Sequence, residues 1–259
     1  MLRFVPLFFI GLVAVLLSAC GGGGETIRNA LAPSDALAAS ADHFSQDVSS
    51  MTGKFTMKFS SGGSSEEMQG NYSFQSPDHM HMTMEFLGNK LEMLMLPPDF
   101  YLYLPQGGWY KIDSNGLGIN FDALKKYAAS RGPMDYSAIA KQIKGISQLP
   151  DEDIDGKSYF HYGGDVDFST LADQLPSGVV DPSALETAKQ AIGTVRTDTW
   201  VDKDSYLPRR FNMGFDFNSN GGADFRMDMS MDVLQYNLPV DIPAAPSNAH
   251  SLSELTPAQ

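Results

Sequence analysis

The protein has 259 residues, and its 31 acidic side chains outnumber the 18 basic ones, which gives a formal net charge of −13 at pH 7. A surface of this sign repels phosphate groups, so the composition argues against nucleic acid as a partner and against charge-driven binding to anionic lipids. Hydrophobic residues make up 42% of the chain, as in ordinary globular proteins, which excludes a globally disordered chain. Methionine is the outlier, with 14 residues.

The N-terminal segment has the pattern of an export signal. One positive charge, on Arg3, precedes an apolar run over residues 4–17, which is shorter than the roughly 20 residues of a membrane-spanning helix. The run ends at residues 17–20 in Leu-Ser-Ala-Cys, which resembles the bacterial lipobox, whose cysteine is diacylated before the signal is cleaved. We therefore expect residues 1–19 to be a lipoprotein signal peptide and Cys20 to carry the lipid.

A flexible linker is expected over residues 20–35. After Cys20 it has four glycines, and a Gly-rich tether of about 15 residues reaches about 20 Å on average. Cys20 is the only cysteine, so its acylation leaves no thiol for a disulfide, a redox pair or a cysteine metal site. Two acyl chains anchor a protein far more stably than one. The expected location is the extracytoplasmic side of the cell membrane, with the folded part close to the lipid surface.

The next segment predicts a helix followed by an antiparallel meander. Apolar residues recur at helical spacing over Ala36–Ser49. The hydrophobic period then changes to two, and short apolar runs alternate with turns rich in Gly, Pro and Asn. The expected strands cover residues 55–60, 68–74, 80–86, 91–96, 100–104 and 109–112.

Helical patterns interrupt the strands in the middle of the chain. Helices are expected over Phe121–Ser130, Tyr136–Ile143 and Ser183–Ala191, the last with Asp181 as its N-cap and a proline at its first position. Strand character returns on both sides of this last helix. The expected strands cover residues 158–168, 194–202, 208–217 and 224–234.

Together these elements predict one α+β domain over residues 36–243 and a loose Pro/Ala/Ser-rich tail over residues 244–259, since neither an internal repeat nor a second linker is found. Short motifs within the domain follow one another in a specific order and spacing. They are Met51-Thr52-Gly53-Lys54-Phe55 after the first helix, Gly107-Gly108-Trp109-Tyr110-Lys111, Asp153-Ile154-Asp155-Gly156 with Tyr159-Phe160-His161-Tyr162, Trp200-Val201-Asp202 with Leu207-Pro208-Arg209-Arg210, and Val240-Asp241-Ile242-Pro243. In these motifs the chain resembles the LppX/LprAFG-type lipoproteins of the LolA-like superfamily.

The resemblance implies a fold and a function. The fold is a strongly curved antiparallel β-sheet, a half-barrel, with helices packed in its concave face. An apolar cavity between the sheet and the helices takes acyl chains, and members of the family carry lipids or glycolipids across the envelope. The cargo differs among members, so the resemblance does not identify it.

Methionine and phenylalanine share one face of several expected strands, and polar residues occupy the other. One face of an antiparallel sheet meets the core, so a packed core is the plain alternative for these side chains. A fixed core is better filled by Leu, Ile and Val, whereas methionine adapts to varied apolar partners. We therefore interpret this face as the lining of a lipid-binding cavity. Its residues are Phe55, Met57, Phe59, Met80, Met82, Met84, Phe86, Met93, Met95, Phe211, Met213, Phe215, Met227, Met229 and Met231.

The register of these strands is strongly specified, because a slip of one residue would expose the apolar side chains and bury the charged ones. We expect the two central helices, residues 121–130 and 136–143, to lie over this face. The residues expected to face them are Phe55, Met57, Met82, Met84, Met213, Met227 and Met229.

Other motifs have plainer interpretations. The His-Met-His-Met run at residues 79–82 combines copper ligands, but strand alternation places its histidines and methionines on opposite faces. Residues 151–156 begin like a calcium-binding loop, yet the twelfth position, which requires a bidentate glutamate, is Tyr162. The pair Arg209-Arg210 is a candidate for a lipid headgroup, although such a pair is usually a solvated face. Catalytic motifs are not found, so neither an enzyme nor a cofactor or metal is expected.

The leading hypothesis is a membrane-anchored envelope lipoprotein that binds the acyl chains of a lipid or glycolipid, as a carrier or chaperone. The alternative is a non-enzymatic interaction or sensor protein, which has the same fold with a filled core and binds an envelope protein instead of cargo. A metal-binding lipoprotein is a third hypothesis. The first two differ in whether lipid stays bound to the purified protein.

Overall fold

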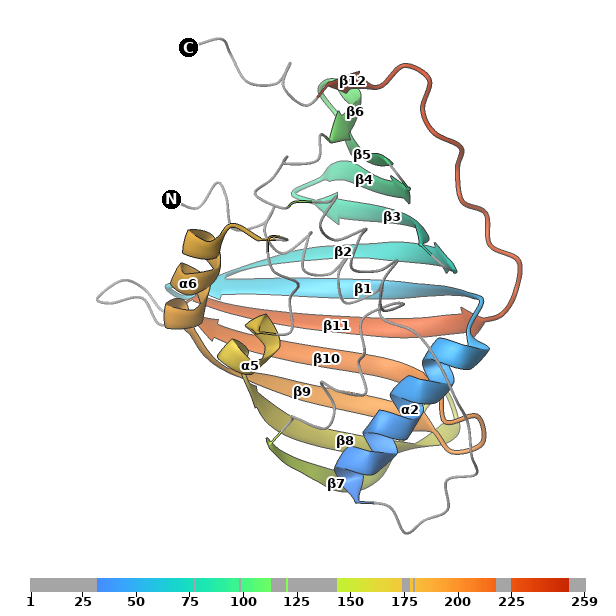
Figure 1. The fold of residues 1–259 in the computed structure, drawn as a ribbon, viewed down its shortest axis with the longest axis vertical. Helices are drawn as coiled ribbons and strands as arrows, with labels where there is room; N and C mark the ends of the chain where they lie inside the picture. The colour runs from blue at the N-terminus through green and yellow to red at the C-terminus, as the bar shows by residue number, and fades with distance from the viewer. Residues whose placement is uncertain are drawn as a thin grey trace.

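The structure, a computed structural model, describes residues 32–76, 78–97, 99–112, 120, 144–173, 178, 180–217 and 225–251. Within these residues twelve strands form a single sheet (Figure 1). The strands are β1 (Ser50–Ser61), β2 (Ser64–Gln75), β3 (His79–Phe86), β4 (Asn89–Leu96), β5 (Asp99–Leu104), β6 (Gly108–Ile112), β7 (Lys144–Ile154), β8 (Lys157–Asp167), β9 (Ile192–Asp202), β10 (Pro208–Phe217), β11 (Phe225–Tyr236) and β12 (His250–Ser251).

Two antiparallel meanders make up the sheet. Strands β1 to β6 are successive neighbours in one half, and strands β7 to β11 are successive neighbours in the other. The halves join where β1 pairs antiparallel with β11, so segments from opposite ends of the domain lie side by side in the middle of the sheet. Figure 1 shows that the strands turn progressively from one edge to the other, which gives a curved, open surface. The prediction of one curved, mostly antiparallel sheet is confirmed.

The first described helix, α2 (Pro33–Asp47), packs against the second half of the sheet. It covers the segment predicted as a helix at 36–49, with its ends shifted by two or three residues. Proline suits its first turn, because the fixed φ is helical and the missing N–H would have no partner there. Leu37 and Ala38 are buried in one cluster with Tyr162 of β8, which fixes the helix on the sheet.

Two further helices connect β8 to β9. The longer one, α6 (Pro182–Ala191), begins as predicted, because the Asp181 carboxylate accepts hydrogen bonds from the backbone N–H groups of Ser183 and Ala184 at 2.9 and 3.1 Å. The shorter one, α5 (Phe168–Ala172), was not predicted. None of the described helices has the length and the apolar composition of a membrane span.

The sequence also failed to predict most of β7, which is the strand at one edge of the sheet. Its residues 147–153 are mainly polar and include Pro150, so they lack the alternation of a half-buried strand. Proline and charged residues are typical of edge strands, where they prevent pairing with another chain. The helices predicted at 121–130 and 136–143 lie outside the described residues.

Two glycines allow large aromatic rings to lie across the neighbouring strand. Gly53 on β1 is paired with Tyr72 on β2, and Gly70 on β2 is paired with Phe55 on β1. A Cβ atom on Gly53 would overlap the Tyr72 ring and the carbonyl oxygen of Asp232, and one on Gly70 would lie 2.7 Å from the Phe55 ring. Glycines inside strands mark bends and close approaches, so these pairs contribute to the curvature of the sheet.

The chain after β11 is held at two points. The Asn237 side chain accepts a hydrogen bond from the Ser49 N–H at 2.7 Å and donates one to the Asp47 carbonyl at 2.7 Å, which ties the end of the sheet to the end of α2. From there the chain runs without regular structure to β12, which pairs in parallel with β6 (Figure 1). The tail predicted to be loose therefore departs from that expectation at residues 250–251.

Candidate functional site

One face of the sheet is apolar, and it carries every residue predicted for the cavity. Strand alternation brings these side chains to the same side of β1, β3, β4, β10 and β11, and we call the set the methionine face. Phe59, Phe86 and Phe211 are half-buried. The buried members are Phe55, Met57, Met80, Met82, Met84, Met93, Met95, Met213, Phe215, Met227, Met229 and Met231.

Strand register sets the methionines side by side. Met213 of β10 is paired with Met229 of β11, Met229 with Met57 of β1, and Met57 with Met68 of β2. A row of four thioether side chains therefore crosses four neighbouring strands. Similar Met–Met pairs join β3 to β4. Because methionine is unbranched and polarisable, these rows form a continuous apolar band that can adjust its shape.

The face is larger than the sequence analysis predicted. Gly70 separates Met68 from Tyr72 along β2, so the apolar alternation of that strand was not recognised as part of the face. Leu171, Leu185 and the helices that carry them add apolar contacts from α5 and α6. The buried residues that were missed are Val48, Met51, Met68, Tyr72, Phe74, Phe100, Leu102, Ile112, Phe168, Ala172, Ile192 and Val195.

Four half-buried phenylalanines lie at one end of the methionine face, and we call them the phenylalanine rim. They are Phe59, Phe86, Phe217 and Phe225, at the ends of β1, β3 and β10 and the start of β11. The Phe59 ring is stacked on Phe225 at 6.2 Å and meets Phe86 edge-on at 6.5 Å, while Phe217 meets Phe225 edge-on at 5.1 Å. The face thus ends in contacting aromatic rings that solvent still reaches.

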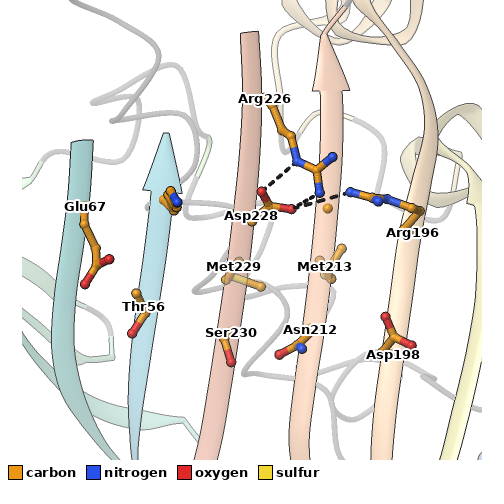
Figure 2. A pocket seen from close by; sticks show the side chains of 12 residues that line it. Thr56, Glu67, Arg196, Asp198, Asn212, Met213, Arg226, Asp228, Met229 and Ser230 are labelled. Carbon is orange, nitrogen blue, oxygen red and sulfur yellow. Dashed lines mark hydrogen bonds and ion pairs between the residues drawn. The ribbon is translucent and has the colours of Figure 1, made fainter. Parts of the chain in front are cut away.

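The opposite face of the sheet is polar. A shallow hollow of about 300 Å³ lies on it over β1, β2, β9, β10 and β11 (Figure 2). Arg226 donates two hydrogen bonds of 2.7 Å to the Asp228 carboxylate, and Arg196 lies 3.5 Å from the same group. The hydrogen bonds from Arg226 hold the pKa of Asp228 below its ordinary value and outweigh the effect of partial burial. Because the two arginines and Asp228 are paired with one another, we interpret the hollow as a solvated ion-pair network.

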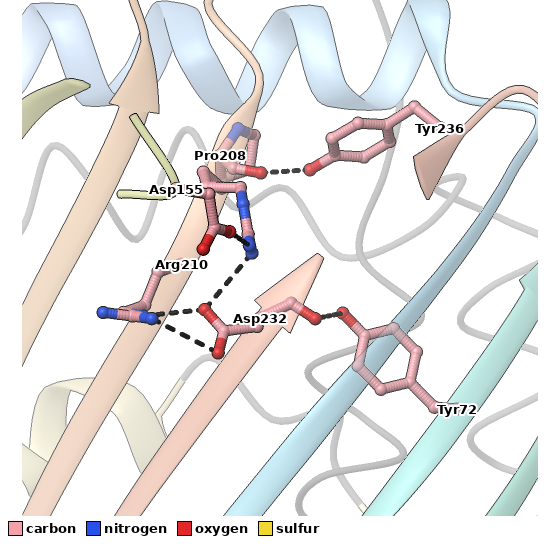
Figure 3. Close-up of polar contacts among 7 residues, drawn as sticks. Tyr72, Asp155, Pro208, Arg210, Asp232 and Tyr236 are labelled. Carbon is pink, nitrogen blue, oxygen red and sulfur yellow. Dashed lines mark hydrogen bonds and ion pairs between the residues drawn. The ribbon is translucent and has the colours of Figure 1, made fainter. Parts of the chain in front are cut away.

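A second polar network joins β2, β10 and β11 (Figure 3). The Tyr72 phenol donates a hydrogen bond to the Asp232 carbonyl oxygen at 3.3 Å, and burial, with the nearby Asp232 charge, raises the pKa of Tyr72. The Asp232 carboxylate accepts hydrogen bonds from Arg210 at 2.7 Å and Arg209 at 3.2 Å, and Arg209 also donates to Asp155 at 2.8 Å. The arginine pair considered for a headgroup is therefore bound to carboxylates of the protein itself.

The His-Met-His-Met run is divided between the two faces, as predicted. His81 lies on the polar face with its Nε2 atom 3.0 Å from the Glu92 carboxylate, whereas Met80 and Met82 are buried on the methionine face. The acidic run at 151–156 ends in the tight turn between β7 and β8. Across the part of the chain that the structure describes, no three His, Cys, Asp or Glu side chains gather around a possible metal position.

The described residues define a class of protein: an α+β chain whose open, curved sheet has an extensive apolar face on one side and an ion-paired polar face on the other. Among solved structures, the chain is similar to the Mycobacterium tuberculosis lipoprotein LppX, with a TM-score of 0.48 and 14% identity, covering 81% of this chain and 99% of that chain. LprF from Mycobacterium bovis gives a TM-score of 0.47 and 11% identity, with 82% and 96% covered.

A third similar structure is the LolA superfamily protein NE2245 from Nitrosomonas europaea, with a TM-score of 0.32 and 13% identity over 81% of this chain and 96% of that chain. No protein-family model and no curated protein matches the chain. These structures include LppX, LprF and a LolA superfamily protein, which belong to the groups that the sequence motifs resemble. All three TM-scores are below 0.5, so the resemblance stays a prediction from the sequence. At these identities function does not carry over, so it has to be inferred from the side chains of the sheet.

Proposed function

We propose that the protein is an envelope lipoprotein whose methionine face binds the acyl chains of a lipid or glycolipid, as a carrier or chaperone. The observation that supports this most is the unbroken apolar band over six neighbouring strands, β4, β3, β2, β1, β11 and β10, in which methionines stand in rows. In this proposal the helices that the sequence predicts at 121–130 and 136–143 lie over the band, and the acylated Cys20 holds the domain on the extracytoplasmic side of the membrane.

The chemistry of the face suits a flexible apolar ligand. Tyr72 is the only ionisable side chain among the described buried residues of this cluster, so little on the face selects for a polar group. Each methylene that leaves water contributes about 0.8 kcal/mol, so an acyl chain of about 16 carbons supplies on the order of 10 kcal/mol before the cost of ordering it. Apolar contact alone can therefore hold the cargo.

Added bulk on the face tests whether it holds cargo. Met82→Trp, Met213→Trp and Met229→Trp each enlarge a side chain that is buried on the face. If the enlarged side chain occupies space that otherwise holds lipid, we expect the purified variant to lose its lipid while its melting temperature hardly changes. Leu94→Trp is the matched control, because Leu94 is equally buried but belongs to the opposite face of β4.

Thermal melts and quantified lipid extracts of the wild type and the four variants provide the measurement. Overpacking of a filled site costs about 1–3 kcal/mol, so Leu94→Trp is expected to melt lower and to keep its lipid. If all three methionine variants melt as low as this control and the wild-type extract contains no lipid, the carrier proposal is wrong. The face is then a packed core, and an interaction protein without cargo takes the place of the carrier.

A further inference from the structure

The turn between β3 and β4 places a leucine where the backbone disfavours it. Leu87 and Gly88 have φ values of +50° and +74°, so both central residues of this two-residue turn are left-handed. Such turns favour Asn or Asp before Gly, because a branched apolar side chain in this region is strained. The turn at Asp155-Gly156 has the same backbone, with φ values of +53° and +80°, and carries the usual aspartate.

No burial of the Leu87 side chain offsets this strain. Its side chain is 65% exposed, which is the largest exposure among the large hydrophobic residues described. A strained residue that persists at the surface without packing is a sign of function. Phe86 of the phenylalanine rim directly precedes it, so the exposed leucine continues the apolar surface of the rim into solvent.

The same end of β1 to β6 carries no charge in its described turns. These turns are Gly62-Gly63, Leu87-Gly88 and the three residues 105–107, Pro-Gln-Gly. At the opposite end of the sheet, three described turns contain an aspartate. These aspartates are Asp78, Asp155 and Asp204. In a chain with a net charge of −13, an anionic lipid surface repels these three uncharged turns less than it repels the turns that contain an aspartate.

We propose that this end of the sheet, with Leu87 at its tip, inserts into the surface of the lipid bilayer and brings the phenylalanine rim to the membrane. The aromatic rings then lie where lipid passes between the bilayer and the methionine face. This inference rests on the proposed function for the passage of cargo, whereas the membrane contact itself stands on the strain, exposure and charge of the turn.

The bilayer fits this surface better than a protein partner does. A single aliphatic side chain on a narrow hairpin offers little area for a stable protein interface, but it suits shallow insertion into the headgroup region. Lys90 follows three residues later with a side chain that is 60% exposed, and its ammonium group lies 2.9 Å from the Glu92 carboxylate, so this ion pair can stay at headgroup level when the tip inserts. The 13 residues from Cys20 to Pro33 extend to roughly 45 Å at most, so the proposed anchor keeps the domain close to the same membrane.

A probe at the tip tests the contact. Because acylation consumes Cys20, Leu87→Cys gives the lipidated full-length protein one free thiol, which takes an environment-sensitive fluorophore. Leu238→Cys is the matched control, since Leu238 is 51% exposed and follows β11 at the opposite end of the sheet. Both proteins are reconstituted into vesicles of phosphatidylcholine and phosphatidylglycerol that contain spin-labelled lipid as quencher.

We expect the fluorophore at position 87 to be quenched at least twofold more than the one at position 238. Equal quenching at the two positions, or none at position 87, overturns the membrane contact. The membrane contact is also wrong if position 87 shows no quenching and the Leu87→Asn substitution converts a dimer to a monomer. In that case the partner of the tip is a second copy of the protein. Lipid extracts of the same preparations separate the two proposals. If the protein contains lipid but the fluorophore at position 87 is not quenched, the membrane contact is wrong and the lipid-binding function stands.

A second variant separates insertion from simple loss of folding. Leu87→Asn relieves the left-handed leucine, so we expect its melting temperature to rise or to stay unchanged. Its rate of lipid uptake from vesicles is expected to fall at least fivefold, with Leu238→Asn close to wild type. Uptake by Leu87→Asn at the wild-type rate contradicts a role of the tip in cargo passage.

Discussion

At the scale of single residues, Gly53 is a position where the sheet depends on the absence of a side chain. We expect Gly53→Ala to destabilise the protein by about 1–3 kcal/mol or more, because the methyl group would overlap the Tyr72 ring and the Asp232 carbonyl oxygen. Gly193→Ala is the control, since a Cβ atom there meets nothing within 4 Å. Urea unfolding of both variants gives the two free energies, and equal values would show that Tyr72 does not need Gly53.

At the scale of elements, the turn between β9 and β10 depends on one carboxylate. The Asp202 side chain accepts hydrogen bonds from the backbone N–H groups of Asp204 and Ser205 at 3.0 and 2.9 Å, and the Lys157 ammonium lies 2.5 Å from its other oxygen. Burial alone would raise the pKa of Asp202, but the hydrogen bonds from Lys157 and from the turn outweigh it and hold the pKa below its ordinary value. The ionised carboxylate therefore stabilises the folded turn.

The sign of the pH dependence follows from this lowered pKa. A carboxyl group with a lowered folded pKa stabilises the protein above its unfolded pKa of about 3.9, and this contribution is lost as the pH falls through the folded value. We expect Asp202→Asn to cost about 1–2 kcal/mol at neutral pH and very little near pH 2. Urea unfolding across this pH range is the measurement, with Asp173→Asn as a control at an exposed ion pair. Parallel stability curves for wild type and Asp202→Asn would contradict the assignment.

The elements that the sequence predicted are those with a local signal. Strands β1, β3, β10 and β11 alternate large apolar with polar residues, so burial on one face is visible in the sequence itself. Strands β4 and β5 instead show as short apolar runs between turns. The edge strand β7 lacks this alternation, because its pairing with β8 on one side requires no continuous apolar face. The five residues of α5 are too few to show a helical period. These two elements depend on tertiary neighbours that no local pattern reveals.

The candidate site was predictable to the same extent and for the same reason. Period two identified which methionines of β1, β3, β4, β10 and β11 share a face, and the register places them on one side of the sheet. Tyr72 was missed because it lies over a glycine on the next strand, which is a relation between strands rather than within one. The strained Leu87 was missed for a related reason, since the sequence pattern placed the turn only between the expected strands 80–86 and 91–96, and the structure centres it on Leu87-Gly88.

At the scale of the whole molecule, the net charge opposes membrane binding, so in this proposal the covalently attached lipid has to supply the membrane affinity. The net charge of −13 repels anionic lipid, and one exposed leucine at a hairpin tip is too small an apolar contact to hold a protein of 28.2 kDa on a bilayer. A single acyl chain gives only marginal binding, whereas two or more give stable anchoring. Stable attachment in this proposal therefore depends on the acylation of Cys20.

We expect Cys20→Ser to leave the protein soluble or uncleaved, because serine cannot accept the thioether-linked lipid that provides the membrane affinity. Cells expressing each form are labelled with palmitate and fractionated, and the label on the protein and its share in the membrane fraction are measured. Ser18→Ala is the matched control, since it keeps a small residue before the cysteine and is expected to behave as wild type. Equal palmitate labelling of Cys20→Ser and wild type would refute the lipid anchor. An unlabelled Cys20→Ser that still sediments with membranes would instead assign attachment to the rest of the chain.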